Sequence, residues 1–289
     1  MSLYATQSAT ILACLFFVGI TQASGARAGA GAPALDEKAA LENSQAAIGR
    51  KPSNHRMVSS HGEELNLHQF RGKPLVISLI YTSCYHTCPT MTNQLARAVD
   101  IAREALGQGS FSVLTIGFDT PSDTPDRMRV FARERGIDMP DWWFASTDAL
   151  TINQLTEELG FTYVRSVRGF DHLTQTTIVN ADGTIFDQVY GELVHAPSFV
   201  EPLKRLVWGG DAKATALSGW IKSVKLVCTV YDPNTGRYTF DYSIFITMVI
   251  GIASLGAVAG FAIKHWWETG RRTTRNKHST GILERFFRF

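Results

Sequence analysis

The chain has 289 residues, 45% of them hydrophobic and 19% charged, which is the composition of a globular protein rather than a disordered or fibrous one. Its net charge of +2 excludes a strongly basic surface over the whole molecule, so we expect no nucleic-acid partner. Four cysteines are too few for a disulfide scaffold at this length.

The N-terminal segment has the pattern of an export signal. The apolar run from Ile11 to Ile20 is short for a bilayer span, and small residues follow it. The segment before this run lacks lysine and arginine, and Cys14 stands in a faint lipoprotein-like box. An uncleaved anchor and a lipidated cysteine therefore stay as alternatives. We predict a cleaved signal peptide over residues 1–30 and a flexible linker over residues 31–51.

The body, residues 52–210, alternates apolar strands with amphipathic helices. A continuous apolar run with β-branched residues predicts a buried strand at 73–83, and Pro89 opens the helix that follows. The same signals predict, in chain order, a buried strand at 111–119, helices at 124–136 and 148–160, a β-hairpin at 176–191 and a helix at 196–207. This alternation predicts an α/β sheet, parallel in its first half. A cysteine pair between the first main strand and its helix is typical of a thioredoxin-like fold.

Three segments follow the body. An Asp-Pro-Asn-Thr-Gly turn within residues 211–242 predicts a small hairpin close to a membrane. Residues 243–263 carry no charge and, as a helix, would span about 30 Å, the thickness of a bilayer core, so we predict a transmembrane helix. A buried core helix is the alternative.

The basic C-terminal tail fixes the predicted orientation in the membrane. Residues 264–289 hold seven Lys or Arg and two Glu, which leaves a net charge of −3 on the rest of the chain. The positive-inside rule places this tail in the cytoplasm. We therefore expect a single-pass protein of the bacterial inner membrane, with its body in the oxidising periplasm.

The chemistry of the body centres on the stretch YTSCYHTCPT. Cys84 falls in the predicted loop and Cys88 in the first helical turn, where free amides and the helix dipole favour anions. The pKa of a thiol falls in such a place, and a thiolate both attacks disulfides and binds Cu(I). The position therefore fits a redox-active pair and copper binding equally well, whereas one Cys-x-x-x-Cys pair is a poor structural zinc site.

A metal site here would need a third ligand. His172 lies just before the predicted hairpin, where thioredoxin-like proteins usually carry a proline beside the thiol loop. A histidine at that place suggests a ligand. The other histidines considered are expected at turns or on the surface: His61, His68, His86 and His195.

Three separated pieces resemble, in order, the SCO/SenC family of copper-binding oxidase-assembly proteins: YTSCYHTCPT, TIGFDTPSDTP and DHLTQTTIVNADGTI. The likeness covers about residues 52–207. It implies that Cys84, Cys88 and His172 bind copper, as Cu(I), Cu(II) or both. It also implies a role in supplying copper to the CuA centre of cytochrome c oxidase, or in keeping the cysteines of that centre reduced.

Two departures from the family pattern stand out. The chain has Asp119-Thr120-Pro121 where the family commonly has Asp-Pro, so Asp119 either tunes the site or caps a helix. The clear apolar span is C-terminal, whereas many members have an N-terminal anchor. Cys228 lies outside the likeness, as a buried inert thiol or a participant in copper handover.

We therefore expect a membrane-anchored copper chaperone. Its partners would be the CuA-bearing oxidase subunit, the membrane, and a periplasmic copper donor or thiol reductase. The alternative is an enzyme, a thiol-disulfide reductase that uses Cys84 and Cys88 without metal. A thiol peroxidase would need a Thr/Arg arrangement that neither cysteine has beside it. A non-catalytic scaffold with a structural disulfide is the remaining alternative.

Overall fold

The computed structural model describes residues 34–84, 87–167, 169–191, 195–209 and 216–286. The predicted signal peptide, with Cys14, lies outside the described residues, and so does His86.

The body is built around a seven-stranded mixed sheet with the strand order β2-β1-β5-β4-β3-β8-β9. The strands β3, β4 and β5 run parallel, and every other neighbouring pair is antiparallel. The bounds of the strands are β1 Arg56–Ser59, β2 Glu64–Asn66, β3 Leu75–Ile80, β4 Ser112–Gly117, β5 Trp142–Ser146, β8 Gln175–Val179 and β9 Ile185–Tyr190. All residues of β3, β4 and β8 are buried, which agrees with sequences made mostly of apolar and β-branched residues.

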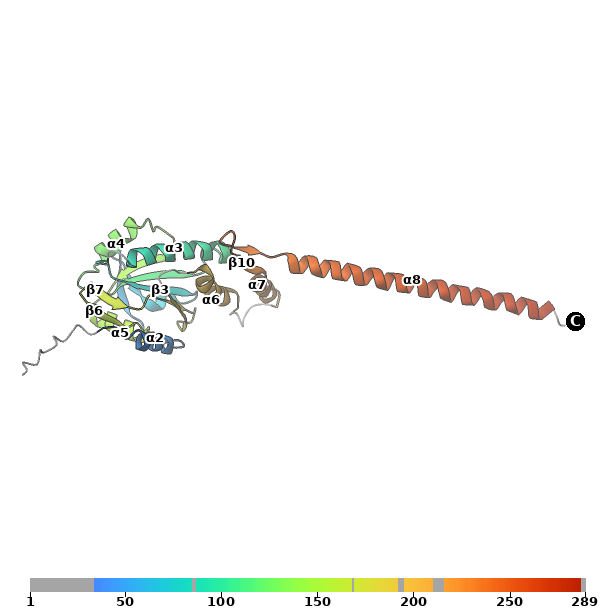
Figure 1. Ribbon diagram of the computed structural model, residues 1–289, viewed down its shortest axis with the longest axis horizontal. Coiled ribbons are helices and arrows are strands. Elements are labelled where there is room, and N and C mark those ends of the chain that lie inside the picture. Colours follow the sequence, from blue (N-terminus) through green and yellow to red (C-terminus); the bar gives the residue numbers. More distant parts are fainter. Residues whose placement is uncertain (1–33, 85–86, 168, 192–194, 210–215, 287–289) are drawn as a thin grey trace, which may run out of the picture.

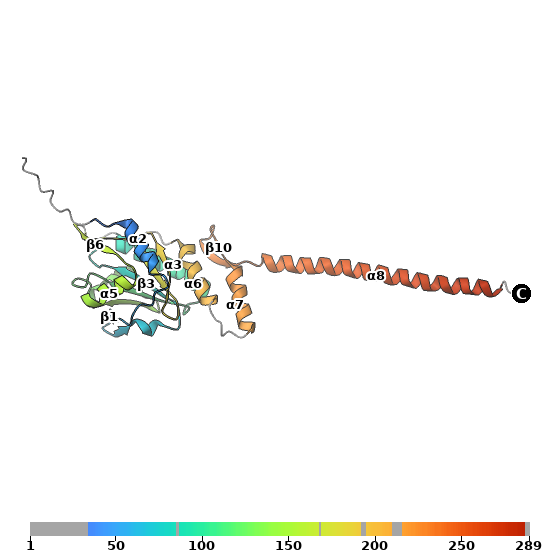
Figure 2. The same cartoon turned by 90° about the horizontal axis from the view of Figure 1, so that it is seen from below.

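Helices cover both faces of this sheet. They are η1 Leu67–Phe70, α3 Thr87–Leu106, α4 Pro125–Glu134, α5 Ala149–Glu158 and α6 Ala196–Trp208. Figure 1 shows α3 and α4 on one face and α5 on the other, and Figure 2 shows α5 from below. Thr124 and Asp148 cap α4 and α5 through their side chains, as predicted. The arrangement is a thioredoxin-like fold, which confirms the predicted fold class.

The predicted flexible linker over residues 31–51 is wrong for about half of its length. Residues Glu37–Ala46 form the helix α2, which lies below the sheet, on the same side as α5 (Figure 1). Ala40 and Ala47 are buried, and the hydroxyl groups of Ser44 and Tyr190 are 2.8 Å apart. An alanine-rich segment therefore becomes ordered because the body offers it a surface to pack against.

The segment between body and C-terminal helix holds more structure than predicted. The predicted hairpin is present as β10 Thr229–Asp232 and β11 Arg237–Phe240, and an unpredicted helix, α7 Ala216–Cys228, precedes it. The hairpin is tied to the body. Arg237 Nη1 lies 2.8 Å from Glu104 Oε1 near the end of α3, and buried Lys204 donates to the Thr229 carbonyl at 2.8 Å.

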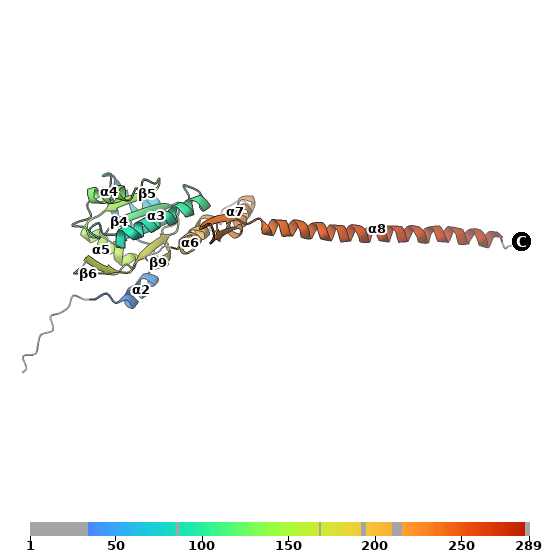
Figure 3. The ribbon, with the colours of Figure 1, turned by 45° about the horizontal axis from the view of Figure 1, so that its top comes forward.

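The last helix, α8, runs from Ser243 to Phe286 and extends away from the body (Figure 3). Its part Ser243–Trp267 is long and apolar enough to cross a membrane. None of its most apolar window is buried, so the alternative of a core helix is wrong. The helix also continues through residues that were predicted as a separate basic tail.

Candidate thiol and metal site

The two cysteines lie where β3 passes into α3. Cys84 closes a turn through its amide to the Tyr81 carbonyl at 3.2 Å, and Cys88 is the second residue of α3. The Cys88 amide donates to Cys84 Sγ at 3.3 Å. Neither cysteine forms a disulfide with a described residue; Cys84 is half-buried and Cys88 is buried. A strand end and a helix start thus hold two sulfur-bearing residues against each other.

The pKa of Cys88 differs from the lowered value that its place at a helix N-terminus predicted. Its pKa is raised, because its hydrogen bond with Cys84 and its burial both favour the protonated form. The helix N-terminus therefore does not make Cys88 the thiolate in this arrangement. Amide donation from Cys88 instead stabilises negative charge on the Cys84 sulfur, which is also the more exposed of the two.

His172 reaches the same region from a separate two-stranded sheet. It ends β7 (Gly169–His172), where it pairs with Tyr163 at the start of β6 (Tyr163–Ser166). His172 Nδ1 donates to the Leu173 carbonyl at 2.8 Å. This bond fixes the tautomer, so that Nε2 carries the lone pair that a metal needs.

Aromatic side chains join the thiol loop to the β6–β7 pair. The Tyr81 ring centroid lies 5.2 Å from that of Phe170 and 6.2 Å from that of His172. Burial and a hydrogen bond with Cys84 raise the pKa of Tyr81. Gly169 has φ +121°, and a Cβ there would lie 2.8 Å from the Tyr81 hydroxyl. Tyr81 is thus one contact between the histidine-bearing pair of strands and the cysteine loop, and Phe118 packs against the same strands, 5.2 Å from Phe170 and 5.7 Å from His172.

A surface cavity of about 390 Å³ connects these groups. Its lining includes Cys84 and His172, together with Ala34, Leu35 and Glu37 from the start of the described chain, but not Cys88. Within the described ranges, no three His, Cys, Asp or Glu side chains are gathered closely enough to hold a metal ion. Cys84 therefore contacts Cys88 and shares a cavity with His172. The three predicted ligands are not brought together in one cluster.

A carboxylate that was not singled out lies under the cysteine loop. The Asp123 carboxylate accepts hydrogen bonds from the Thr82 and Asp119 amides at 2.7 and 2.8 Å. Asp119 itself caps no helix by its side chain, and its carboxylate lies 3.9 Å from Arg165. The sequence feature that could have pointed to Asp123 is the Asp-Thr-Pro motif, in which Asp123 directly precedes the N-cap of α4.

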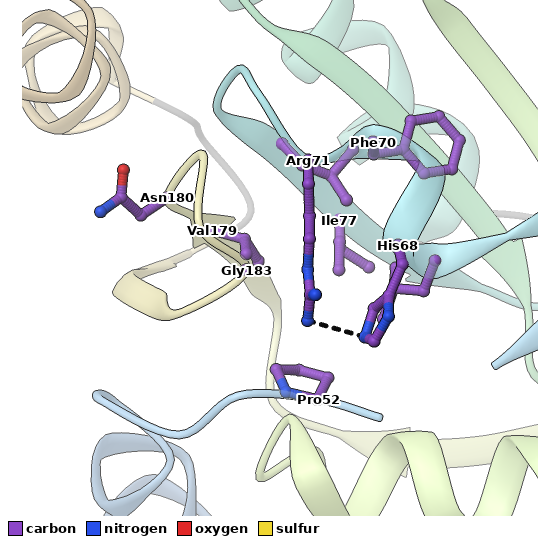
Figure 4. Close-up of a pocket in the computed structure, with 10 residues that line it drawn as sticks. Pro52, His68, Phe70, Arg71, Ile77, Val179, Asn180 and Gly183 are labelled. Atoms are coloured by element: carbon purple, nitrogen blue, oxygen red, sulfur yellow. Dashed lines mark hydrogen bonds between the residues drawn. The ribbon is translucent and has the colours of Figure 1, made fainter. Parts of the chain in front are cut away.

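His172 is the histidine that lines the cavity beside Cys84, and His61, His68 and His195 are absent from that lining. His68 Nε2 is 2.8 Å from Arg71 Nη2 beside a cavity of about 20 Å³, which leaves room for about one water (Figure 4). His61 is exposed, and His195 precedes α6. The surface or turn positions predicted for these three are confirmed.

Cys228 is buried at the opposite end of α3 from the thiol pair. It ends α7, and its carbonyl accepts the Asp241 amide at 2.7 Å. The adjoining β11 contacts the C-terminal part of α3, a helix of 20 residues and therefore about 30 Å long. Cys228 is thus too far away to share an ion with Cys84 in one molecule.

Comparison with known proteins identifies the family. A family model described as SCO1/SenC matches residues 44–207, more than half of the chain. The chain belongs to the SCO1/SenC family. A comparison with curated proteins gave no significant match.

Solved structures resemble the body of this SCO1/SenC protein. A proposed electron transfer protein from Aquifex aeolicus VF5 is 28% identical, over 58% of this chain and 99% of its own, with a TM-score of 0.52. A SCO1/SenC family lipoprotein from Bacillus anthracis str. Ames is 18% identical, over 55% and 95%, with a TM-score of 0.49. Bradyrhizobium japonicum ScoI with copper bound is 19% identical, over 54% and 99%, with a TM-score of 0.45.

Proposed function

We propose that this SCO1/SenC protein is a membrane-anchored copper chaperone that supplies the CuA centre of a cytochrome c oxidase. The carrying observation is the shared cavity, which Cys84 and His172 both line, while the Cys88 amide donates to the Cys84 sulfur. Family membership supports copper binding and oxidase assembly in general.

The proposed ligands are Cys84, Cys88 and His172. Thiolates favour Cu(I), and an added imidazole makes Cu(II) acceptable, so the cargo is copper in either state. His172 is prepared for this role by the bond from Nδ1 to the Leu173 carbonyl, which leaves Nε2 as the donor atom. Because Cys88 is buried outside the cavity lining, binding requires its sulfur and the imidazole to approach Cys84.

The proposed location is the bacterial inner membrane, with the body in the periplasm. The apolar part of α8 supports a membrane anchor, and the excess of Lys and Arg after residue 263 supports a cytoplasmic C-terminus. The CuA-bearing subunit of the oxidase is then the proposed recipient. A periplasmic copper donor or thiol reductase would maintain the site.

A second function is favoured by the unequal exposure of the two thiols. Cys84 is half-buried at a cavity and Cys88 is buried against it, so Cys84 can attack a target disulfide and Cys88 can resolve the product. Cys84 would form a mixed disulfide and release one target thiol. Cys88 would then attack Cys84 and release the second, leaving a Cys84–Cys88 disulfide. A thiol reductase must return two electrons before the next cycle.

The copper content of the oxidase in cells carrying His172→Ala separates the two functions, because this variant keeps both thiols. Chaperone activity predicts an oxidase deficient in copper that added copper restores. Normal oxidase copper in this variant would contradict the chaperone and favour the reductase.

A further inference from the structure

Asp123 is a buried carboxylate that lies between the ends of two parallel strands. Its side chain is 1% exposed. Oδ1 accepts the amide and the hydroxyl of Thr82, both at 2.7 Å, and Oδ2 accepts the Asp119 amide at 2.8 Å. Thr82 is two residues before Cys84, and Asp119 follows β4. One side chain therefore joins the loop that carries the thiols to the strand next to it.

This arrangement requires a carboxylate rather than any small polar group. Both oxygens accept hydrogen bonds from N–H or O–H groups, whereas an amide would turn its own N–H₂ toward one of these donors. Among the described residues no lysine, arginine or histidine forms an ion pair with Asp123; burial raises the pKa of its carboxyl group, and the hydrogen bonds from Thr82 and Asp119 oppose that rise. An unpaired buried charge is costly, and such a group is usually retained for a purpose other than stability.

The neighbouring backbone is shaped to accommodate Asp123. Gly117, at the end of β4, faces it so closely that a Cβ at this position would lie 2.4 Å from the Asp123 Cβ. The turn also closes on itself, because the amides of Ser122 and Asp123 both donate to the Asp119 carbonyl at 2.8 Å. Contacts other than the one with Thr82 therefore hold Asp123 in place, and its carboxylate can act as a rigid support for the loop.

We infer that Asp123 is a positioning residue for the thiol pair: by holding Thr82 it sets the place of Cys84 relative to Cys88 and to the cavity shared with His172. The effect of Asp123 on copper binding rests on the proposed function. The position of the two thiols does not, because it is a property of the metal-free protein. Asp123 touches neither sulfur and acts only through Thr82.

The test compares Asp123→Asn with Asp148→Asn in the purified full-length protein in detergent. Asp148 is a matched control, because it also accepts two amides and one hydroxyl, from Leu150 and Thr151, at an exposed helix start that shares no residue with the site. The first readout is the equilibrium of the reduced protein with oxidised glutathione, which yields the Cys84–Cys88 disulfide and two reduced glutathiones. Positioning predicts that Asp123→Asn lowers this equilibrium constant at least about fivefold, whereas Asp148→Asn leaves it unchanged.

The second readout is copper binding. Asp123→Asn should weaken copper affinity at least about tenfold and alter the Cu(II)–thiolate absorption, as loss of an outer support does at metal sites. Thr82→Val, which removes only the hydroxyl, should show part of both effects, and Thr82→Ser should restore both. This pair also carries the test if Asp123→Asn does not fold.

An unchanged disulfide equilibrium in both Asp123→Asn and Thr82→Val would overturn the positioning role. Equal losses in Asp148→Asn would do the same, because they would show a general effect of stability. A wild-type protein that binds no copper would instead overturn the proposed function, while the glutathione equilibrium would still decide the role of Asp123.

Discussion

Replacing Gly169 by alanine should disturb the site through one contact. Gly169 begins β7, whose last residue is His172, and it has φ +121°, a conformation that residues with a Cβ rarely adopt. The new methyl group would lie 2.8 Å from the Tyr81 hydroxyl and 3.0 Å from the ring carbon Cε2. Ordinary contacts are several tenths of an ångström longer, so Tyr81 or the β6–β7 pair must move apart.

Two effects of different size follow. The strained backbone should lower the free energy of unfolding by about 1–3 kcal/mol. The displacement of β7 from Tyr81 should also move the His172 imidazole relative to Cys84, and we expect copper affinity to fall about tenfold, as for other disturbed supports of metal ligands.

Gly62→Ala is the control for the backbone effect. Gly62 has φ +87°, and a Cβ there would meet no atom within 4 Å. Urea denaturation and competitive copper titration of both full-length variants give the two quantities. We expect both variants to lose stability, Gly169→Ala more than Gly62→Ala because of the Tyr81 contact, and only Gly169→Ala to lose copper affinity. Equal copper affinities in the two variants would refute the claim that Tyr81 sets the place of the histidine-bearing strands.

Three further predictions concern groups outside the cavity. Glu158 accepts Ser53 N and Oγ and pairs with His55 Nε2 at 2.6 Å; burial opposes ionisation, but these bonds lower its pKa overall. Its contribution to the free energy of unfolding is present above the ordinary pKa of 4.5 and is lost as the pH falls below that value. Glu158→Gln should therefore lower this free energy, measured by urea denaturation, by about 2–3 kcal/mol at pH 7 and by less at pH 4. Equal losses at the two pH values would contradict this argument. Lys51, with the Thr184 amide, lowers the pKa of Asp182 from 3.8 to about 2, so the stability that this pair contributes is lost as the pH falls from about 4 to about 2. Because the pair is half exposed and solvent screens its charges, Asp182→Asn should remove less than about 1 kcal/mol of stability in an acid titration. A larger loss would contradict this screening by solvent. Cys228→Ser should leave the copper stoichiometry of the full-length protein unchanged, and a lost copper ion would show that the distance argument from α3 is wrong.

Local sequence signals predicted the centre of the fold well. The buried strands β3 and β4 are mostly apolar runs, and Thr124 and Asp148 are of residue types that are preferred as helix N-caps. The thiol pair was placed correctly at the start of α3 for the same reason, because a strand, a loop and a helix start can all be recognised from neighbouring residues.

Elements that depend on tertiary packing were missed. The helix α2 is ordered by contacts of Ala40 and Ala47 with the body, and no local pattern shows these. The strands β6 and β7 have four residues each and pair only with each other in the main-chain ladder, so their half-exposed sequences lack a strand signature.

The candidate site was predictable in its residues but not in its supports. Cys84, Cys88 and His172 were recognisable as ligand types at suggestive places. Asp123 was not, because its partner Thr82 is 41 positions away in sequence. Their contact exists only once β3 and β4 lie side by side. The raised pKa of Cys88 was missed because it arises from the hydrogen bond with Cys84 and from burial by the body, and a position at a helix N-terminus shows neither.

Copper titration of the purified, reduced full-length protein tests the central claim most directly. We predict a single copper ion per chain, with a Cu(II)–thiolate absorption that is lost in Cys84→Ser and Cys88→Ser and strongly altered in His172→Ala. His61→Ala, which removes an exposed histidine away from the thiols, should behave as wild type. If His172→Ala keeps the copper affinity and Cu(II) spectrum of the wild type, the three-ligand copper site is wrong.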